Sequence, residues 1–151
     1  MTIRVTEPFF TYEDDPAEPG WKLWAFRDPT RFNASLGPMH VKMEDGLARV
    51  RITPGRGHSN MRGVLHGGAL LGFMDVALFG AARGFGVMGA GGAVTLDLSA
   101  QFIAAGRVGE PLEARLELLR ETGRLIFLRG LVVQEGGHTV ASFTGTVRKI
   151  G

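Results

Sequence analysis

The longest apolar stretch of the chain runs from residue 69 to residue 82 and is interrupted by one charged side chain, Asp75. Apolar residues fall on every face of a helix over this stretch, a pattern typical of a buried helix rather than an amphipathic surface helix. We therefore predict a helix from His66 to about Arg83. An ionised carboxylate at Asp75 is costly in this setting unless it is paired or hydrogen-bonded. Its presence therefore indicates that this residue has a specific role.

Strand-like runs lie on both sides of the predicted helix. Two short runs flank the hairpin signal Asp45-Gly46, and several of the four long runs after the helix alternate between apolar and polar residues. The predicted strands are 39–43, 47–53, 93–103, 111–120, 125–134 and 139–149. In the run 93–103, one face carries Val94, Leu96, Leu98, Ala100 and Phe102, and the other carries Thr95, Asp97, Ser99 and Gln101.

This order of elements predicts a single sheet around one central helix. The four long strands are joined by short glycine-containing turns, so we expect one antiparallel meander. A single sheet and one hydrophobic helix suggest that the sheet wraps the helix. Such a sheet leaves an edge that must be covered or paired, and dimerisation through edge strands would satisfy it.

The N-terminal segment differs from the rest of the chain. Residues 1–32 are rich in proline and aromatic residues and show little regular period, so we treat them as an extension and residues 33–151 as the main domain. A disordered segment rarely carries so many aromatic residues. We expect the extension to pack on the domain surface or against a partner subunit, with a short helix near residues 29–35.

Composition narrows the class of protein. The chain has 151 residues, enough for one domain with a real core, and a net charge of +2, which implies no large binding surface for nucleic acid. It has no cysteine, which excludes disulfides, thiolate catalysis and cysteine-based zinc sites. No membrane span, signal peptide or metal-ligand spacing is evident, so we expect a cytoplasmic protein that binds neither membrane nor metal.

The glycine-rich segment before the helix would supply the second component of the candidate site, beside the carboxylate of Asp75. Gly67 and Gly68 would deliver backbone N–H groups at the helix start, where partial positive charge accumulates. His66 and Asp75 are nine residues apart, which corresponds to about 13–14 Å along a helix and roughly half a turn of rotation. Either only one end of the motif is catalytic, or two chains build each site from one loop and the other chain's Asp75.

The spacing Asn60-x-x-Gly63-x-x-His66-Gly67-Gly68, followed by Asp75, resembles the signature of hotdog-fold acyl-CoA thioesterases of the PaaI-like type. The resemblance covers roughly residues 33 to 149 and includes the strand around Thr95. It implies an α+β hotdog fold, an antiparallel sheet wrapped around one long hydrophobic helix, assembled as a dimer or dimer of dimers. It also implies hydrolysis of an acyl- or aryl-CoA thioester, with CoA as part of the substrate and no separate cofactor.

The same resemblance implies a role for each matched residue. Asp75 would attack the thioester or activate water, and the Gly67 N–H would polarise the carbonyl and hold the developing oxyanion. His66 would orient the loop, Asn60 would help to position the thioester or the water, and Thr95 would orient the attacking water. The CoA end would meet Gly68 and a subset of arginines, with Arg124 and Arg107 as leading candidates, followed by Arg120 and Arg148.

Structural interpretations remain open beside these roles. Asp75 could be a buried acid capped by backbone N–H groups, and His66 could have the structural role of hydrogen-bonding its own loop. Asn60 and Thr95 could be ordinary turn and strand residues. The apolar residues Leu71, Phe73, Met74 and Phe79 could shape an acyl pocket or simply form core. A hotdog hydratase or dehydratase and a non-catalytic acyl-CoA-binding protein remain the alternative functions.

Overall fold

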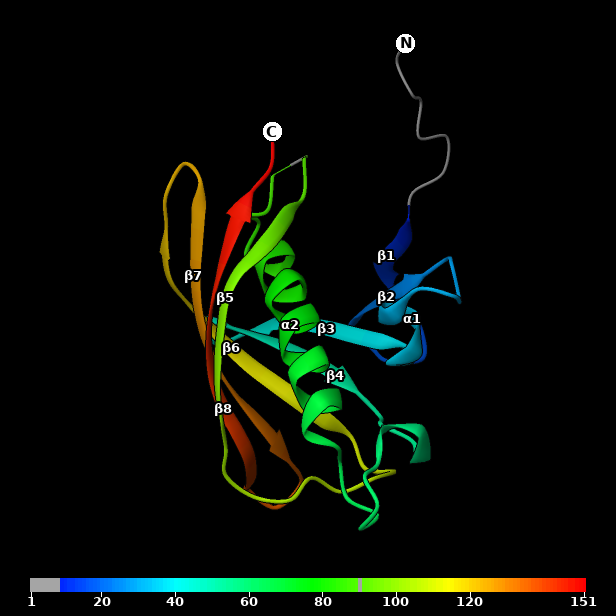
Figure 1. Cartoon of the computed structure of the whole chain (residues 1–151). Coiled ribbons are helices and arrows are strands. Elements are labelled where there is room, and N and C mark those ends of the chain that lie inside the picture. Colours follow the sequence, from blue (N-terminus) through cyan, green and yellow to red (C-terminus); the bar gives the residue numbers. More distant parts are fainter. Residues whose placement is uncertain (1–8, 90) are drawn as a thin grey trace.

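The computed structural model describes residues 9–89 and 91–151, and these form one antiparallel sheet with a long helix against one face (Figure 1). The strand order is β1-β2-β3-β4-β6-β7-β8-β5. The strands are β1 (Phe10–Asp14), β2 (Lys22–Phe26), β3 (Met39–Glu44), β4 (Leu47–Ile52), β5 (Ala93–Phe102), β6 (Leu112–Glu121), β7 (Leu125–Gln134) and β8 (His138–Lys149). The helical elements are α1 (Phe32–Ser35), the 3-10 turn η1 (Arg56–His58) and α2 (Gly67–Gly84).

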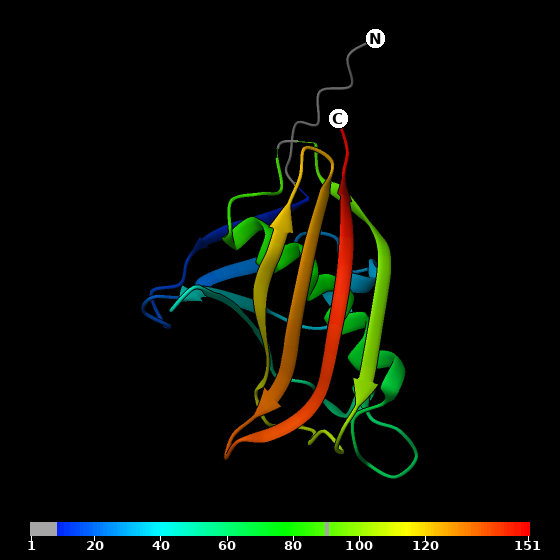
Figure 2. The same cartoon turned by 90° about the vertical axis from the view of Figure 1, so that its left-hand side faces the viewer.

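Helix α2 is the centre of the hydrophobic core. Its buried residues include Phe73, Met74, Leu78 and Ala81, and they pack against inward-facing side chains of the sheet. The strands curve around the helix, which lies behind β6, β7 and β8 when the sheet faces the viewer (Figure 2). The expectation of a sheet wrapped around one buried helix is therefore confirmed, and the α2 boundaries differ from the predicted ones by one residue.

The strand order differs from the meander that the sequence suggested. Strands β6, β7 and β8 are consecutive neighbours, but β5 pairs with β8 and β6 pairs with β4. The chain therefore crosses from the end of β5 to the middle of the sheet before it begins β6. The expectation that β5 would pair with the next strand was wrong, and β5 instead forms one edge of the sheet.

A β-bulge in β5 changes which residues face the helix. Thr95 lies opposite Val147 and Asp97 lies opposite Thr146, so Leu96 is an extra residue without a partner position. A bulge of this kind reverses the alternation of side chains beyond it. The expected common face from Val94 to Phe102 was therefore wrong, because Leu98 and Ala100 pack against the core whereas Val94 and Leu96 are 44% and 55% exposed.

The described part of the N-terminal segment has regular structure that the sequence did not indicate. Strands β1 and β2 form a hairpin that extends the sheet beyond β3, and the side chain of Trp24 is only 3% exposed. Trp24 packs directly on α2 at Gly80, where an added Cβ would lie 3.0 Å from the indole ring. The expected short helix near residues 29–35 is reduced to the single turn α1.

Candidate active site

Asp75 lies in the middle of α2 and points toward strand β5. Its Oδ1 accepts a hydrogen bond of 2.6 Å from the Thr95 hydroxyl, and the carboxylate is half-buried. The bulge at Leu96 makes this contact possible, because it places Thr95 on the helix face together with Leu98 and Ala100. The sequence grouped Asp97 with Thr95, but Asp97 is exposed on the far side of the bulge. Asp75 therefore has a single side-chain hydrogen-bond donor among the described residues.

The start of α2 is built as an N-H-rich turn. His66 is the N-cap residue, and its Nδ1 accepts a 2.8 Å hydrogen bond from the backbone N–H of Gly68. Gly67 is the first helical residue, so its N–H has no carbonyl within the helix to bind. The aromatic ring of Phe102, at the end of β5, lies beside Gly67. This turn presents a backbone donor at the positive end of the helix dipole.

Asn60 holds the loop that leads into this turn. Its Oδ1 accepts hydrogen bonds from the backbone N–H groups of Arg62 at 2.9 Å and Val64 at 3.3 Å. His58 supports the same loop, because its Nδ1 accepts from the Gly55 N–H and its Nε2 contacts the Ser35 carbonyl at 2.7 Å. Within one chain, the side chains of Asn60 and His66 are thus engaged in shaping the loop.

The two halves of the candidate site are separated along the helix. Asp75 follows Gly67 by eight residues, which is about 12 Å of helix rise, or more than two turns. Thr95 stays with Asp75, whereas Asn60 and His66 stay with Gly67. One chain therefore brings together the carboxylate with its threonine and, at a different place, the loop with its N–H donor.

The arginines suggested for CoA binding lie at opposite ends of the sheet. Arg120 and Arg124 lie at the β6–β7 turn, at the end of the sheet toward which the C-terminal end of α2 points (Figure 1). Arg107 follows Gly106, whose carbonyl accepts a 3.0 Å hydrogen bond from the Leu65 N–H just before α2. The Arg107 side chain also pairs with Glu110 at 3.2 Å. One chain cannot direct all three guanidinium groups to one phosphate.

Two arginines outside that set lie nearer the loop. Arg56 and Arg62 line an open pocket together with Asn60 and His66. Arg62 lies inside the Asn60-to-His66 motif, so its position in the sequence was a usable signal. These cations are close to the first turn of α2, where a phosphate or carboxylate would also meet backbone N–H groups.

The apolar candidates divide into core and pocket residues. Phe73 and Met74 are fully buried in the core, at 1% and 0% exposure, and Leu71 is exposed. Phe79 is half-buried and lines a pocket of about 680 Å³ between α2 and the β1–β2 hairpin. Of the four residues that the sequence offered for an acyl pocket, Phe79 alone faces a sizeable cavity.

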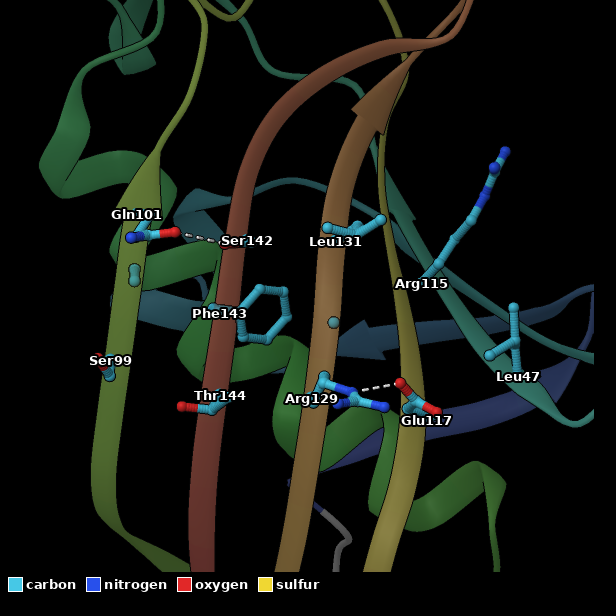
Figure 3. Close-up of a pocket in the computed structure, with 12 residues that line it drawn as sticks. Leu47, Ser99, Gln101, Arg115, Glu117, Arg129, Leu131, Ser142, Phe143 and Thr144 are labelled. Atoms are coloured by element: carbon cyan, nitrogen blue, oxygen red, sulfur yellow. Dashed lines mark hydrogen bonds and ion pairs between the residues drawn. The ribbon is translucent and has the colours of Figure 1, made fainter.

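A different pocket of about 700 Å³ lies on the face of the sheet away from α2 (Figure 3). Its walls come from β4 to β8 and include the ion pair between Arg129 and Glu117 and the side chains of Gln101 and Ser142. None of the predicted site residues lines it.

The described residues contain no cluster of three or more potential metal ligands. No helix within 9–89 and 91–151 is long and apolar enough to cross a membrane.

Comparisons with known proteins identify the family of this chain. The profile of the Thioesterase superfamily matches residues 62–141, which include the start of α2, Asp75 and Thr95. The chain therefore belongs to the thioesterase superfamily. No curated protein sequence matches it significantly.

Solved structures narrow the description to a PaaI-like hotdog thioesterase. The PaaI protein of the E. coli phenylacetic acid degradation operon is 25% identical, with a TM-score of 0.68 over 81% of this chain and 86% of that one. A mutant of the phenylacetic acid degradation protein PaaI from Thermus thermophilus is 31% identical, with a TM-score of 0.65 over 82% and 100% of the two chains. A hypothetical thioesterase from Streptococcus pneumoniae, solved with coenzyme A, is 21% identical, with a TM-score of 0.69 over 79% and 91%.

Proposed function

We propose that this thioesterase hydrolyses an acyl- or aryl-CoA to the free acid and CoA, with Asp75 as the nucleophile or general base. The hydrogen bond from Thr95 to the half-buried Asp75 carboxylate carries the proposal, because it orients a charged group that an apolar helix would otherwise exclude. If Asp75 acts as a base, it takes a proton from water as the oxygen attacks the thioester carbon. The C–S bond then breaks and the CoA sulfur leaves as a thiolate that is reprotonated.

The Gly67 N–H supplies the second component, a donor for the carbonyl oxygen. A preorganised backbone donor at a helix start stabilises the negative charge that develops on this oxygen. His66 and Asn60 hold the loop that fixes the direction of the donor, through their hydrogen bonds to Gly68, Arg62 and Val64.

We place each site between two subunits, because Asp75 and Gly67 lie too far apart along one helix to meet one thioester. The edge strand β5 supports a paired assembly. It carries the exposed apolar side chains Val94, Leu96 and Phe102, and its outer backbone groups are free to pair with a second sheet edge. Pairing of two β5 strands would bring the Asp75 of one chain toward the Gly67 loop of its partner.

Two observations support a CoA thioester as the substrate: a similar solved structure and the arginines of this chain. The solved thioesterase of S. pneumoniae contains coenzyme A. In this chain the phosphates would meet arginines from both ends of the sheet, with Arg107, Arg120 and Arg124 joined by Arg56 and Arg62, whereas the Gly68 N–H already donates to His66 Nδ1. A subunit interface would reconcile their separation within one chain.

A thiol-release assay over a panel of acyl- and aryl-CoA thioesters tests the activity, with Asp75→Asn as the key variant. We expect turnover of at least one thioester and a loss of about 10²–10⁴-fold in kcat for Asp75→Asn, with folding preserved. A hydratase or a non-catalytic binding protein would release no thiol. Full activity in the folded variant would remove Asp75 from the mechanism.

The shared site has its own test in mixed subunits. Asp75→Asn chains mixed with chains altered at Gly67 should regain part of the activity, since one of the two sites in each mixed dimer combines an intact loop with an intact carboxylate. Verified subunit exchange without any recovery would show that each chain forms its own site.

A further inference from the structure

Aromatic side chains line much of the pocket between α2 and the N-terminal hairpin, and Asp28, Arg31 and Asn33 line it as well. Phe10, Trp24 and Phe26 come from β1 and β2, and Phe79, Arg83 and Met88 come from α2 and the segment after it. We call this cavity the hairpin pocket. Its volume of about 680 Å³ is within the range of small-molecule sites, and its aromatic side chains suit a hydrocarbon or aryl group.

The aromatic side chains form one connected wall. The ring centroids of Phe10 and Trp24 are 5.8 Å apart in an edge-to-face arrangement, and those of Trp24 and Phe26 are 4.9 Å apart. Trp24 is anchored against α2 at Gly80, which has no side chain to displace it. This packing holds the pocket open on a fixed scaffold, so a ligand does not have to create the cavity.

Arg83 is the cation of the pocket that pairs with no acid among the described residues, whereas Arg31 pairs with Asp28. Its guanidinium carbon lies 4.5 Å from the ring centroid of Phe10 and 5.9 Å from that of Tyr12. Its Nε is buried and has no hydrogen-bond partner within 9–89 and 91–151, and no Asp or Glu of this part of the chain forms an ion pair with it. A half-buried cation held against aromatic rings is costly without an anion, and guanidinium binds a carboxylate through two parallel hydrogen bonds.

The hairpin pocket lies on the same stripe of α2 as the candidate carboxylate. Phe79 follows Asp75 by one helical turn and Arg83 follows it by two, which places Arg83 about 12 Å farther along the axis. The Arg83 guanidinium itself lies over the ring of Phe10, another residue of the pocket. On the facing strand, Ala93 lines the pocket two residues before Thr95. A thioester held at Asp75 can therefore extend its acyl group into the pocket.

We propose that the hairpin pocket binds the acyl portion of the substrate and that Arg83 selects acyl groups ending in a carboxylate. The substrates would be monothioesters of dicarboxylic acids with an apolar aliphatic or aryl middle. This inference rests on the proposed function, since it assigns the acyl end of the same thioester. Arg83 is a specificity-determining residue here, because it contacts the end of the substrate that does not react.

The test compares thioesters that differ only at the far end of the acyl group: adipoyl- with hexanoyl-CoA, and suberoyl- with octanoyl-CoA. For the wild-type enzyme, kcat/KM should favour the carboxylated member of at least one pair by tenfold or more, a ratio equivalent to about 1.4 kcal/mol. The variant Arg83→Met should abolish this preference, because kcat/KM should fall much more for the carboxylated member of a pair than for the neutral member. Arg83→Lys, which retains the charge, should keep part of it.

Arg31 offers a matched control. It is an arginine at the rim of the same pocket, but it is largely exposed and pairs with Asp28 at 3.2 Å, so Arg31→Gln should keep the preference. If Arg83 serves only to stack on Phe10, Arg83→Met would lower thermal stability and change both members of a pair equally. Wild-type turnover without a carboxylate preference in any pair would overturn this inference and leave the proposed function standing. Wild-type protein that hydrolyses no thioester would overturn the proposed function.

Discussion

The Thr95 hydroxyl donates a 2.6 Å hydrogen bond to Asp75 because Leu96 bulges out of strand β5. Without that extra residue, the strand would alternate as its sequence suggests, and Thr95 would point away from α2. The bulge thus couples a local irregularity of an edge strand to the orientation of a carboxylate on the central helix, a common use of bulges near functional sites.

Removing the Thr95 hydroxyl should lower turnover without removing the carboxylate. Thr95→Val keeps the shape of the side chain and deletes the donor, so kcat should fall by about tenfold to hundredfold, as expected for a hydrogen bond to a charged group. Thr95→Ser keeps the hydroxyl and should retain most of kcat. Steady-state thiol release checks both variants, and equal activity of Val and Ser would show that the hydroxyl does not orient Asp75.

A single backbone N–H can be deleted at the start of α2. Proline is well tolerated at the first helical position, and His66 before it has the extended ψ of 136° that proline requires. Gly67→Pro should therefore fold and lose about 10²–10³-fold in kcat, the usual effect of removing one oxyanion donor. Gly67→Ala keeps the N–H, and its Cβ meets only Phe102 at 3.7 Å, so it is the matched control. Comparable losses in the two variants would point to a steric cause.

His66 should act through the loop rather than on the substrate. His66→Ala removes the acceptor for the Gly68 N–H and should lower the free energy of unfolding by about 1 kcal/mol, whereas His66→Asn, a good N-cap, should restore it. Urea unfolding measures this difference, and kcat should follow the same order. If both variants lose activity with unchanged stability, His66 contacts the substrate instead.

Acid stability should depend on Glu113. Burial raises the pKa of this carboxyl, but hydrogen bonds from Arg49 and Arg115 outweigh burial and hold its pKa below the ordinary value of 4.5. A group whose pKa is lower in the folded state stabilises the protein above its unfolded pKa, and this contribution disappears as the pH falls through the folded pKa. Part of the stability should therefore be lost below about pH 4.5.

The matched variant for this effect is Glu113→Gln, which cannot ionise. Its urea midpoint should be lower than that of the wild type at neutral pH, and the gap should narrow as the pH falls below the ordinary glutamate pKa. A gap that stays constant across this range would assign the acid response to other carboxylates.

The elements of the main domain were predictable because their hydrophobic periods are strong. The helix at Asp75 and the six strands after residue 38 were each placed within about two residues of their observed ends. The strand order was not, because local patterns do not say that β5 pairs with β8 rather than with β6. The hairpin of β1 and β2 was missed because its prolines and acidic turn masked two short strands whose stability comes from Trp24 packing on α2.

The candidate site was predictable as a set of residues but only in part as a geometry. The helix rise separates Gly67 from Asp75 in any helical interpretation, and the structure retains that separation. The contact of Thr95 with Asp75 depends on the bulge at Leu96, and the local sequence pattern does not predict this bulge. The division at residue 33, the cytoplasmic location and the roles of the arginines remain predictions.

The N-terminal hairpin is a continuous piece of chain that forms one edge of the sheet, where β2 pairs with β3. Neither Thr95, which hydrogen-bonds Asp75, nor the loop before α2 belongs to this hairpin. Natural variation could therefore replace this piece, and the acyl groups accepted could diverge among relatives while the hydrolytic machinery stays constant. A graft of residues 9–26 from one relative to another is the protein-engineering form of the same exchange.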